Sequence, residues 1–301
     1  MTYIIGIDAG GTKTNAIIMD RQKNILFSVE VGFGNLQVDF QEASCHIWKA
    51  ITKCLGSIYG ERCKVIVAGI AGIEAKNHRV RLERFLRERT LLPIILVNDA
   101  ILAYHAMLGN EDGVLTIAGT GSISYGRNGD KEGYTGGWGH LLGDEGSSYH
   151  VVMQAFRKIT AEADQACPHS SLSRVLLHEI SAKRAEEIKE FIYQANKGEI
   201  AALSVVVFSE AVKGDQEARE HFYRAGQELA KQTARLYHKL QLARPLKLAS
   251  KGSLLEKNLY VQSEYEKVLS SMVGDVEWIR DEKNVSATGA LSLASHYIEE
   301  E

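Results

Sequence analysis

Residues 3–19 are YIIGIDAGGTKTNAIIM, and this stretch decides the fold. Two apolar runs, 3–8 and 15–19, flank a turn that contains two glycines, two threonines and a lysine. β-Branched runs bounded by such a turn predict two neighbouring strands. A third run at 25–30 follows a second turn at 20–24. Three consecutive strands are therefore expected to open the chain.

Helices and buried strands alternate after these three strands. Apolar residues at three- and four-residue spacing predict a helix over 40–59. Apolar runs predict strands at 64–69 and 94–97, and helices are expected at 78–89, which is basic and amphipathic, and at 100–108. Continuous apolar strands that alternate with helices indicate an α/β fold whose sheet is partly parallel and covered on both faces.

The strand pattern restarts after residue 113, with strands expected at 114–118 and 122–126. An Asn128-Gly129 dipeptide then suits a type I′ hairpin turn. The chain from residue 145 onward is expected to be mostly helical, with one strand at 246–250 and a last helix over about 286–299. The restart places a domain boundary near residues 110–114.

Composition excludes several classes of protein. The 301 residues include 35 Lys and Arg against 38 Asp and Glu, so the net charge of −3 gives no bias toward nucleic acid or anionic lipid. No apolar stretch reaches the roughly 18 residues that a membrane-spanning helix needs. The four cysteines lack zinc-site spacing, and no signal peptide is evident. We therefore expect no partner of either class, no structural metal, and a cytoplasmic protein with reduced thiols.

The turn between the first two strands is the first motif with chemical potential. Gly10 and Gly11 let backbone N–H groups approach an anion, and Thr12 and Lys13 add hydroxyl and ammonium donors. The predicted ligand is phosphate, beside which Asp8 is expected to hold Mg²⁺ through water. An ordinary hairpin turn is the alternative. No helix follows, and the Walker spacing is absent, which excludes a P-loop or Rossmann enzyme.

The second motif repeats this chemistry in the second strand-led unit, where Gly119, Thr120 and Gly121 precede Ser122. Two such loops facing each other across a cleft would hold one triphosphate from both sides. Two turns that merely reverse strands remain the alternative, although duplication makes the phosphate interpretation more specific.

Asn98-Asp99 and a glycine-tryptophan segment complete the motifs. Asp99 follows the buried strand at 94–97, where a carboxylate projects toward ligands and suits a general base. The alternative role, to which the sequence gives equal support, is to cap the N-terminus of the helix that follows. Residues 136–147 are GGWGHLLGDEGS, in which Trp138 suits stacking on a sugar face and Asp144 suits accepting from sugar hydroxyls.

These four motifs, in this order, resemble the N-acetylglucosamine kinase and BadF/BadG/BcrA/BcrD ATPase family of the actin, hexokinase and heat-shock-protein-70 superfamily. The resemblance runs from residue 4 to about 296 and is most specific at 136–147. It implies an α/β fold of two ribonuclease-H-like (actin-like ATPase) domains with an interdomain cleft. The first domain would span 1–112, with the C-terminal helix 287–301 packing back on it, and the second 113–286.

The resemblance also implies roles for individual residues. Thr12 and Thr120 would contact the ATP phosphates, and Asp99 would be the catalytic base. Sugar contacts would come from Asn35, Asp99, Ser122, Gly137, Trp138, Gly139 and Asp144. Ala211 and the segment with Gly252 and Ser253 would lie near the nucleoside, although Lys251 replaces the first glycine of the family's usual pair.

The predicted function is therefore phosphoryl transfer from Mg·ATP to the 6-hydroxyl of an amino sugar. N-acetylglucosamine is the first choice, with N-acetylmuramic acid or glucosamine left open. The cofactors would be ATP and Mg²⁺, and a homodimer is left open. The alternatives are an ATPase that drives a protein partner and a non-catalytic sugar sensor. The cluster cysteines of the family's iron–sulfur activators and the zinc motif of repressor-type sugar kinases are both missing from the sequence.

Overall fold

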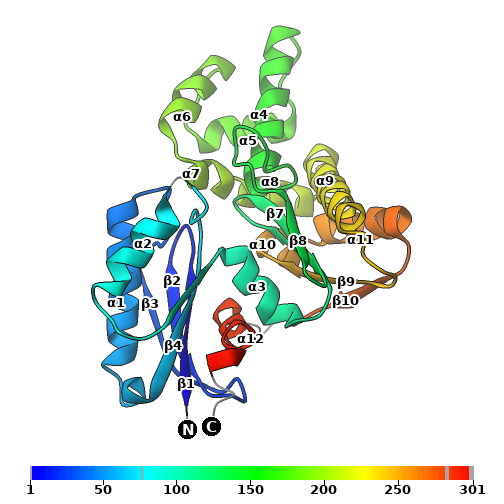
Figure 1. Ribbon diagram of the computed structural model, residues 1–301. Helices are drawn as coiled ribbons and strands as arrows, with labels where there is room; N and C mark the ends of the chain where they lie inside the picture. The colour runs from blue at the N-terminus through cyan, green and yellow to red at the C-terminus, as the bar shows by residue number, and fades with distance from the viewer. Residues whose placement is uncertain (1, 76, 282–284, 298–301) are drawn as a thin grey trace. The chain divides into compact units, whose positions relative to one another are not determined.

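The computed structural model describes residues 2–75, 77–281 and 285–297. The chain divides into two compact units, which Figure 1 shows as ribbons. Unit 1 comprises Met1–Glu111 and Ile279–Glu301, and unit 2 comprises Asp112–Trp278. Each unit is built on one five-stranded sheet with helices packed against it.

The sheet of unit 1 has the strand order β3-β2-β1-β4-β5. Its strands are β1 (Tyr3–Ala9), β2 (Thr14–Met19), β3 (Ile25–Val31), β4 (Cys63–Ile70) and β5 (Ile94–Val97). β1 pairs antiparallel with β2 and parallel with β4, and β5 adds to β4 in parallel. The three opening strands and the partly parallel sheet are confirmed.

Helices cover both faces of this sheet, as predicted. α1 (Phe40–Leu55) and α2 (His78–Arg87) lie on one face, and α3 (Asp99–Leu108) lies on the other (Figure 1). α1 begins at the N-cap Asp39, whose side chain accepts from the Glu42 amide, and it ends before Gly56. The predicted extension to residue 59 is wrong, because the chain turns at Gly56 and enters the 3₁₀ turn η1 (Gly60–Arg62).

The C-terminal segment packs on the α3 side of the sheet of unit 1. It is not the single helix expected over 286–299 but three short pieces: η3 (Ser286–Gly289), α12 (Ala290–Leu293) and η4 (Ser295–Tyr297). Good helix formers cluster only at 290–294, between residues of lower helix propensity. Residues 298–301 of the predicted helix lie outside the described residues. A Cβ on Gly6 would clash with the Ala287 carbonyl, so the segment meets β1 backbone to backbone.

The sheet of unit 2 has the order β10-β9-β6-β7-β8. Its strands are β6 (Gly113–Ala118), β7 (Ser122–Asn128), β8 (Lys131–Gly136), β9 (Leu246–Lys251) and β10 (Val276–Ile279), of which β10 was not predicted. The β7–β8 hairpin forms, but its central residues are Gly129 and Asp130, because Asn128 pairs with Lys131. Of the two central residues only Gly129 has a positive φ, 59°, which fits type II′ and corrects the type I′ prediction.

The rest of unit 2 is helical, as predicted. Its helices are α4 (Ser148–Asp164), α5 (Ser171–Glu179), η2 (Ala185–Glu187), α6 (Ile188–Gln194), α7 (Lys197–Ala202), α8 (Ser204–Lys213), α9 (Gln216–Leu240), α10 (Ser253–Lys257) and α11 (Leu259–Val273). The long helix α9 packs against β6, β7 and β8 on one side and against α11 on another.

A buried hydroxyl network ties α9 and α11 to the sheet of unit 2. The Thr116 hydroxyl lies 2.9 Å from Ser124 Oγ and 2.7 Å from Thr233 Oγ1. Thr233 Oγ1 in turn lies 2.9 Å from the Tyr265 hydroxyl. Because buried polar groups are costly unless hydrogen-bonded, these contacts hold the helices in one register on the strands.

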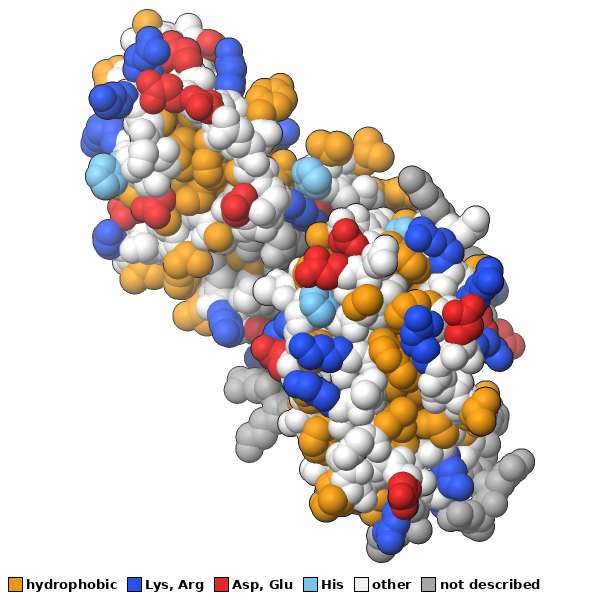
Figure 2. All heavy atoms as spheres, turned by 90° about the vertical axis from the view of Figure 1, so that its left-hand side faces the viewer, with side chains coloured by type: hydrophobic (Ala, Val, Ile, Leu, Met, Phe, Trp, Pro, Cys, Tyr) orange, Lys and Arg blue, Asp and Glu red, His pale blue; other side chains and the backbone are white. Residues whose placement is uncertain are grey.

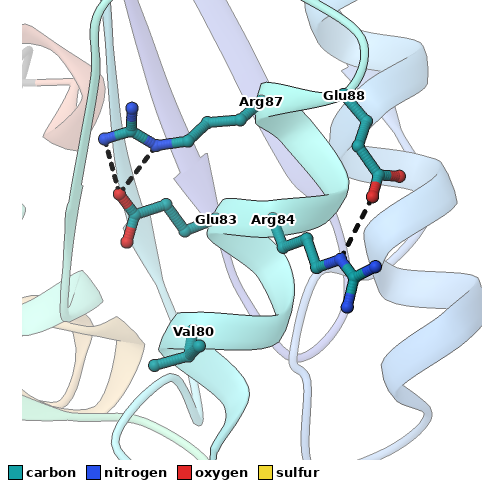
Figure 3. Close-up of a pocket in the computed structure, with 5 residues that line it drawn as sticks. All are labelled: Val80, Glu83, Arg84, Arg87 and Glu88. Atoms are coloured by element: carbon teal, nitrogen blue, oxygen red, sulfur yellow. Dashed lines mark hydrogen bonds and ion pairs between the residues drawn. The ribbon is translucent and has the colours of Figure 1, made fainter.

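Acidic and basic side chains pair with one another on the surface. On α2, Glu83 pairs with Arg87 and Arg84 with Glu88 along the exposed side of the helix (Figure 3). On the face drawn in Figure 2, basic and acidic side chains are interspersed. Among the described residues no helix is both long and apolar enough to cross a bilayer.

Candidate functional site

The first glycine loop joins β1 to β2 in unit 1. The Gly10 amide donates to the Lys13 carbonyl over 2.9 Å, which closes a tight turn. A Cβ on Gly11 would meet nothing within 4 Å, and its φ lies outside the left-handed region. Packing and backbone conformation therefore do not require glycine at position 11. Its absent side chain instead leaves the loop backbone open to an incoming group.

Lys13 is paired in a way that the sequence motif did not indicate. Its ammonium lies 2.6 Å from Glu30 Oε2 on β3, and both side chains are 56% exposed. Such an exposed pair contributes at most about 1 kcal/mol, so a phosphate would readily compete for the ammonium. The phosphate contact at Lys13 stays a prediction.

Two carboxylates lie at the carboxyl ends of strands in the parallel part of the same sheet. Asp8 is near the end of β1, and Asp99 begins α3 directly after β5. Burial, and then the negative charge of Asp8, raises the pKa of Asp99 to about 6. The N-cap of α3 is Asn98, whose side chain accepts from the Ala100 amide over 2.9 Å. The capping alternative thus applies to Asn98, and Asp99 is not needed for it.

The Asn35 loop lies against the first glycine loop. The Gly34 amide donates to the Gly10 carbonyl over 2.8 Å. Asn35 Oδ1 accepts from the Gln37 amide over 2.9 Å, so this oxygen maintains the turn. Unit 1 therefore brings the Asn35 loop to the predicted phosphate loop, and the sugar contact by Asn35 stays a prediction.

The second glycine loop, between β6 and β7, has the same character as the first. The Gly119 amide donates to the Gly121 carbonyl over 2.9 Å, and its carbonyl accepts from the Ser148 amide over 2.8 Å. A Cβ on Gly119 would meet nothing within 4 Å. Thr120, at the tip of the loop, is exposed. The loop is thus held at its base and open at its tip.

The glycine-tryptophan segment 136–147 is hydrogen-bonded to Ser122 at the start of β7. The Gly137 amide donates to the Ser122 carbonyl over 3.0 Å, and Ser122 Oγ donates to the Glu145 carbonyl over 2.7 Å. The Ser122 amide donates to Asp144 Oδ1 over 3.1 Å. Ser122 is buried and its hydroxyl is engaged, so its predicted sugar contact, which stays untested, would share that hydroxyl.

Asp144 is held in an unusual conformation and in a charged contact. Its φ is 62°, which a non-glycine residue rarely adopts, and the residue is 3% exposed. Lys197 Nζ, from the first residue of α7, lies 2.6 Å from Asp144 Oδ2. The sequence does not single out Lys197, because the helical stretch around it is charged and resembles solvated surface.

The tip of the same segment presents apolar side chains to solvent. Trp138 is 75% exposed, and Leu141 and Leu142 are exposed beside it in the sequence. Gly137 and Gly139 have φ values of 73° and 81°, which only glycine adopts without strain. The indole is therefore available for stacking, as expected for a sugar contact.

The predicted nucleoside segment lies against the second glycine loop. β9 pairs in parallel with β6, and Lys251 is opposite Ile117. Gly252 follows with a φ of 96°, and a Cβ there would clash with the Ala118 carbonyl. Ser253 is exposed at the start of α10. These contacts place Gly252 and Ser253 beside the second glycine loop of the same unit.

Ala211 lies elsewhere in unit 2, on α8. Its methyl group is fully buried in the core. Its carbonyl accepts from Arg219 Nε over 2.8 Å and from the Tyr260 hydroxyl over 3.2 Å. The nucleoside contact at Ala211 stays a prediction, and the methyl group is not presented at the surface.

Comparison with known proteins identifies a family and named relatives. A model of the BadF/BadG/BcrA/BcrD ATPase family matches residues 5–294. The chain is 32% identical to the N-acetylmuramic acid/N-acetylglucosamine kinase of Clostridium acetobutylicum, over 98% of each protein. It is 30% identical to the N-acetyl-D-glucosamine kinase of Dictyostelium discoideum, over 70% of this chain and 72% of that protein.

Solved structures share the fold. A crystal structure from Chromobacterium violaceum has a TM-score of 0.77 at 22% identity, covering 97% of this chain and 99% of that one. A ROK family glucokinase from Streptomyces griseus, in complex with glucose and AMPPNP, has a TM-score of 0.62 at 17% identity, covering 98% and 99%. The predicted fold class is confirmed. Because the family model spans almost the whole sequence, the chain belongs to the BadF/BadG/BcrA/BcrD ATPase family.

Proposed function

We propose that this chain is an ATP-dependent kinase that phosphorylates the 6-hydroxyl of an amino sugar, with N-acetylglucosamine as the first substrate to test. One observation carries the proposal: the first hairpin of each sheet has a glycine, Gly11 or Gly119, that packing does not require. Both relatives described above are named as amino sugar kinases, which supports the same reaction. N-acetylmuramic acid and glucosamine are the other substrates to test.

The two glycine loops would bind the phosphates of ATP. Backbone amides at Gly11 and Gly121 would donate to phosphate oxygens, and the Thr12, Lys13 and Thr120 side chains would add donors. Gly10 and Gly119, whose amides close the two turns, would let phosphate approach the loop backbone. Gly252 and Ser253, which lie beside the second loop, would contact the nucleoside.

Asp99 would accept the proton of the sugar hydroxyl. Its pKa of about 6 means that it is mostly ionised at pH 7 and is still basic enough to take a proton. The sugar would be held by Asn35, Ser122, Gly137, Trp138, Gly139 and Asp144. Trp138 would stack on the apolar face of the ring.

Asp8 would hold Mg²⁺ through water. The residues fit this ion, because the Asp8 carboxylate lies at the end of β1 beside a predicted phosphate loop. The described residues contain no cluster of three or more His, Cys, Asp or Glu side chains that could hold a metal. Mg²⁺ keeps several waters and takes few protein ligands when it binds with substrate phosphates, so one carboxylate would be enough to hold it. Bound there, the ion would neutralise charge on the phosphates.

A panel assay tests the proposal. Sugar phosphate formation from ATP is measured with N-acetylglucosamine, N-acetylmuramic acid and glucosamine. Gly11→Ala and Gly119→Ala should fold normally yet raise the KM for ATP, because the new methyl groups would occupy space needed by phosphate. Gly133→Ala in β8 is the matched control, since its Cβ would make only ordinary 3.7 Å contacts.

Two results would favour other functions. ATP hydrolysis that no amino sugar changes would indicate an ATPase coupled to a protein partner. Tight sugar binding without turnover of ATP would indicate a sugar sensor. An unchanged KM for ATP in both glycine variants would refute the assignment of phosphate binding to the two glycine loops.

A further inference from the structure

The ion pair between Lys197 and Asp144 lies inside the proposed sugar site, although no motif includes Lys197. Besides its 2.6 Å contact with Asp144 Oδ2, the ammonium lies close to the second glycine loop. A Cβ on Gly121 would be 2.7 Å from Lys197 Nζ and 2.8 Å from Asp144 Oδ1. The pair therefore lies directly over the backbone that leads into Ser122.

The two partners differ in how much of each is accessible. Asp144 is buried, and its Oδ1 already accepts from the Ser122 amide. The Lys197 side chain is 30% exposed. Of the carboxylates that the structure describes, Asp144 alone pairs with this ammonium. An ammonium has three N–H donors, so Lys197 retains donors for a ligand after it has bound Asp144.

This geometry has different consequences for neutral and acidic sugars. A neutral sugar at Asp144 must share that carboxylate with Lys197 and offers the ammonium only hydroxyl oxygens. A sugar that carries a carboxylate offers it a second anion, so that the ammonium bridges two carboxylates through charge-assisted hydrogen bonds. Without Lys197, the same sugar would bring its negative charge toward that of Asp144.

We propose that Lys197 selects for an amino sugar bearing a carboxylate, such as the lactyl group of N-acetylmuramic acid. The inference rests on the proposed function, because it takes residues 136–147 as the sugar site. It makes Lys197 a specificity residue that contacts the substituent, while the neutral part of the sugar is held by the residues named above.

The test compares three ligands on the full chain: N-acetylglucosamine, N-acetylmuramic acid and the methyl ester of N-acetylmuramic acid. The ester keeps the bulk of the lactyl group and removes its charge. Both kcat/KM and the Kd from calorimetry without ATP are measured for the wild type, Lys197→Met, Lys197→Arg and Lys189→Met. Lys189 is an exposed lysine on α6 and is the matched control.

In the wild type, the acid should bind about 10-fold or more tightly than the ester, a comparison that requires no variant to fold. Lys197→Met should lower the preference for the acid over N-acetylglucosamine by about 10- to 100-fold, the usual range for a hydrogen bond to a charged group. In Lys197→Met, the kcat/KM and Kd for the ester should change by no more than those for N-acetylglucosamine. Lys197→Arg should retain most of the preference, and Lys189→Met should retain all of it.

Several results would overturn the inference. In the wild type, these are equal Kd values for the acid and the ester, or no binding of the acid at all. In Lys197→Met, they are an unchanged preference for the acid over N-acetylglucosamine, or an equal loss of affinity for the acid and the ester. If the wild type binds these sugars but phosphorylates none of them, the proposed function fails. The Kd ratios then still decide the role of Lys197.

Discussion

The raised pKa of Asp99 predicts how the reaction depends on pH. If Asp99 is the general base, only its ionised form is active, so kcat/KM for the sugar should fall as the pH is lowered through about 6. A carboxyl with that pKa is roughly 90% ionised at pH 7 and roughly 10% ionised at pH 5. We therefore expect about a ninefold fall in kcat/KM between these two values, whereas an aspartate of ordinary pKa, about 3.9, would give an almost flat profile.

The assay measures sugar phosphate in stopped samples, so that no coupling enzyme limits the rate at low pH. An NMR titration of the chain without ATP or Mg²⁺, in the wild type and in Asp8→Asn, separates the Asp99 carboxyl from other titrating groups such as ATP. Because the Asp8 charge is the second cause of the raised pKa, after burial, Asp8→Asn should lower the pKa of Asp99 in the metal-free chain without restoring the ordinary value. Asp99→Asn should lose about 10²–10⁴ in kcat. A flat rate profile from pH 5 to 7, or a pKa of Asp99 that Asp8→Asn leaves unchanged in the metal-free chain, would refute the assignment.

The same pKa predicts an effect on stability. The pKa of Asp99 in the folded chain lies above its ordinary value of 3.8, so folding favours the protonated form. The contribution of Asp99 to the free energy of unfolding is therefore fully present below about pH 4 and is lost as the pH rises through 6. Asp99→Asn removes that loss and should be more stable than the wild type at pH 7, by about 1–3 kcal/mol at 1.36 kcal/mol per pKa unit. Urea unfolding at pH 4 and pH 7 measures the difference.

Three further predictions concern the fold. Gly6→Ala should destabilise the chain by about 1–3 kcal/mol, because its methyl group would clash with the Ala287 carbonyl; an unchanged urea midpoint would contradict this close approach. A thiol reagent at pH 8 should label only Cys45 and Cys167 in the native chain and all four cysteines in urea, because burial raises the pKa of both other thiols, to about 12 and about 11. Tyr265→Phe should cost about 1 kcal/mol of unfolding free energy by removing a hydroxyl from the buried network, and a neutral result would show that the network does not stabilise the fold.

Most strands were predictable because their signal is local. β1 to β5 are mainly apolar runs bounded by turn residues, and such a run can be recognised from its own sequence alone. β10 has four residues and lies at the edge of its sheet, where short strands carry little signal. The hairpin after β7 was predicted, but its turn type was not, because the type depends on which residues pair across it.

The candidate site could be proposed from the sequence only where a motif carries its chemistry. The glycine loops and Asp99 stand out because glycine pairs and a carboxylate after a buried strand are rare combinations. Lys197 does not stand out, because a lysine in a charged helical stretch is usually solvated surface. Its partner Asp144 is 53 positions away, and only the packing of α7 against α4 brings the two together.

The division of the chain has a consequence for its synthesis. Unit 2 is encoded between the two parts of unit 1, so all of residues 112–278 leave the ribosome before the segment that completes unit 1 does. Until residues 285–294 emerge, Ile4, Ile17 and Val67 line a sheet face that lacks part of its cover. The nascent chain thus carries an apolar surface that a chaperone could recognise while its later unit is already able to fold. A premature stop after residue 281 would make that transient surface permanent.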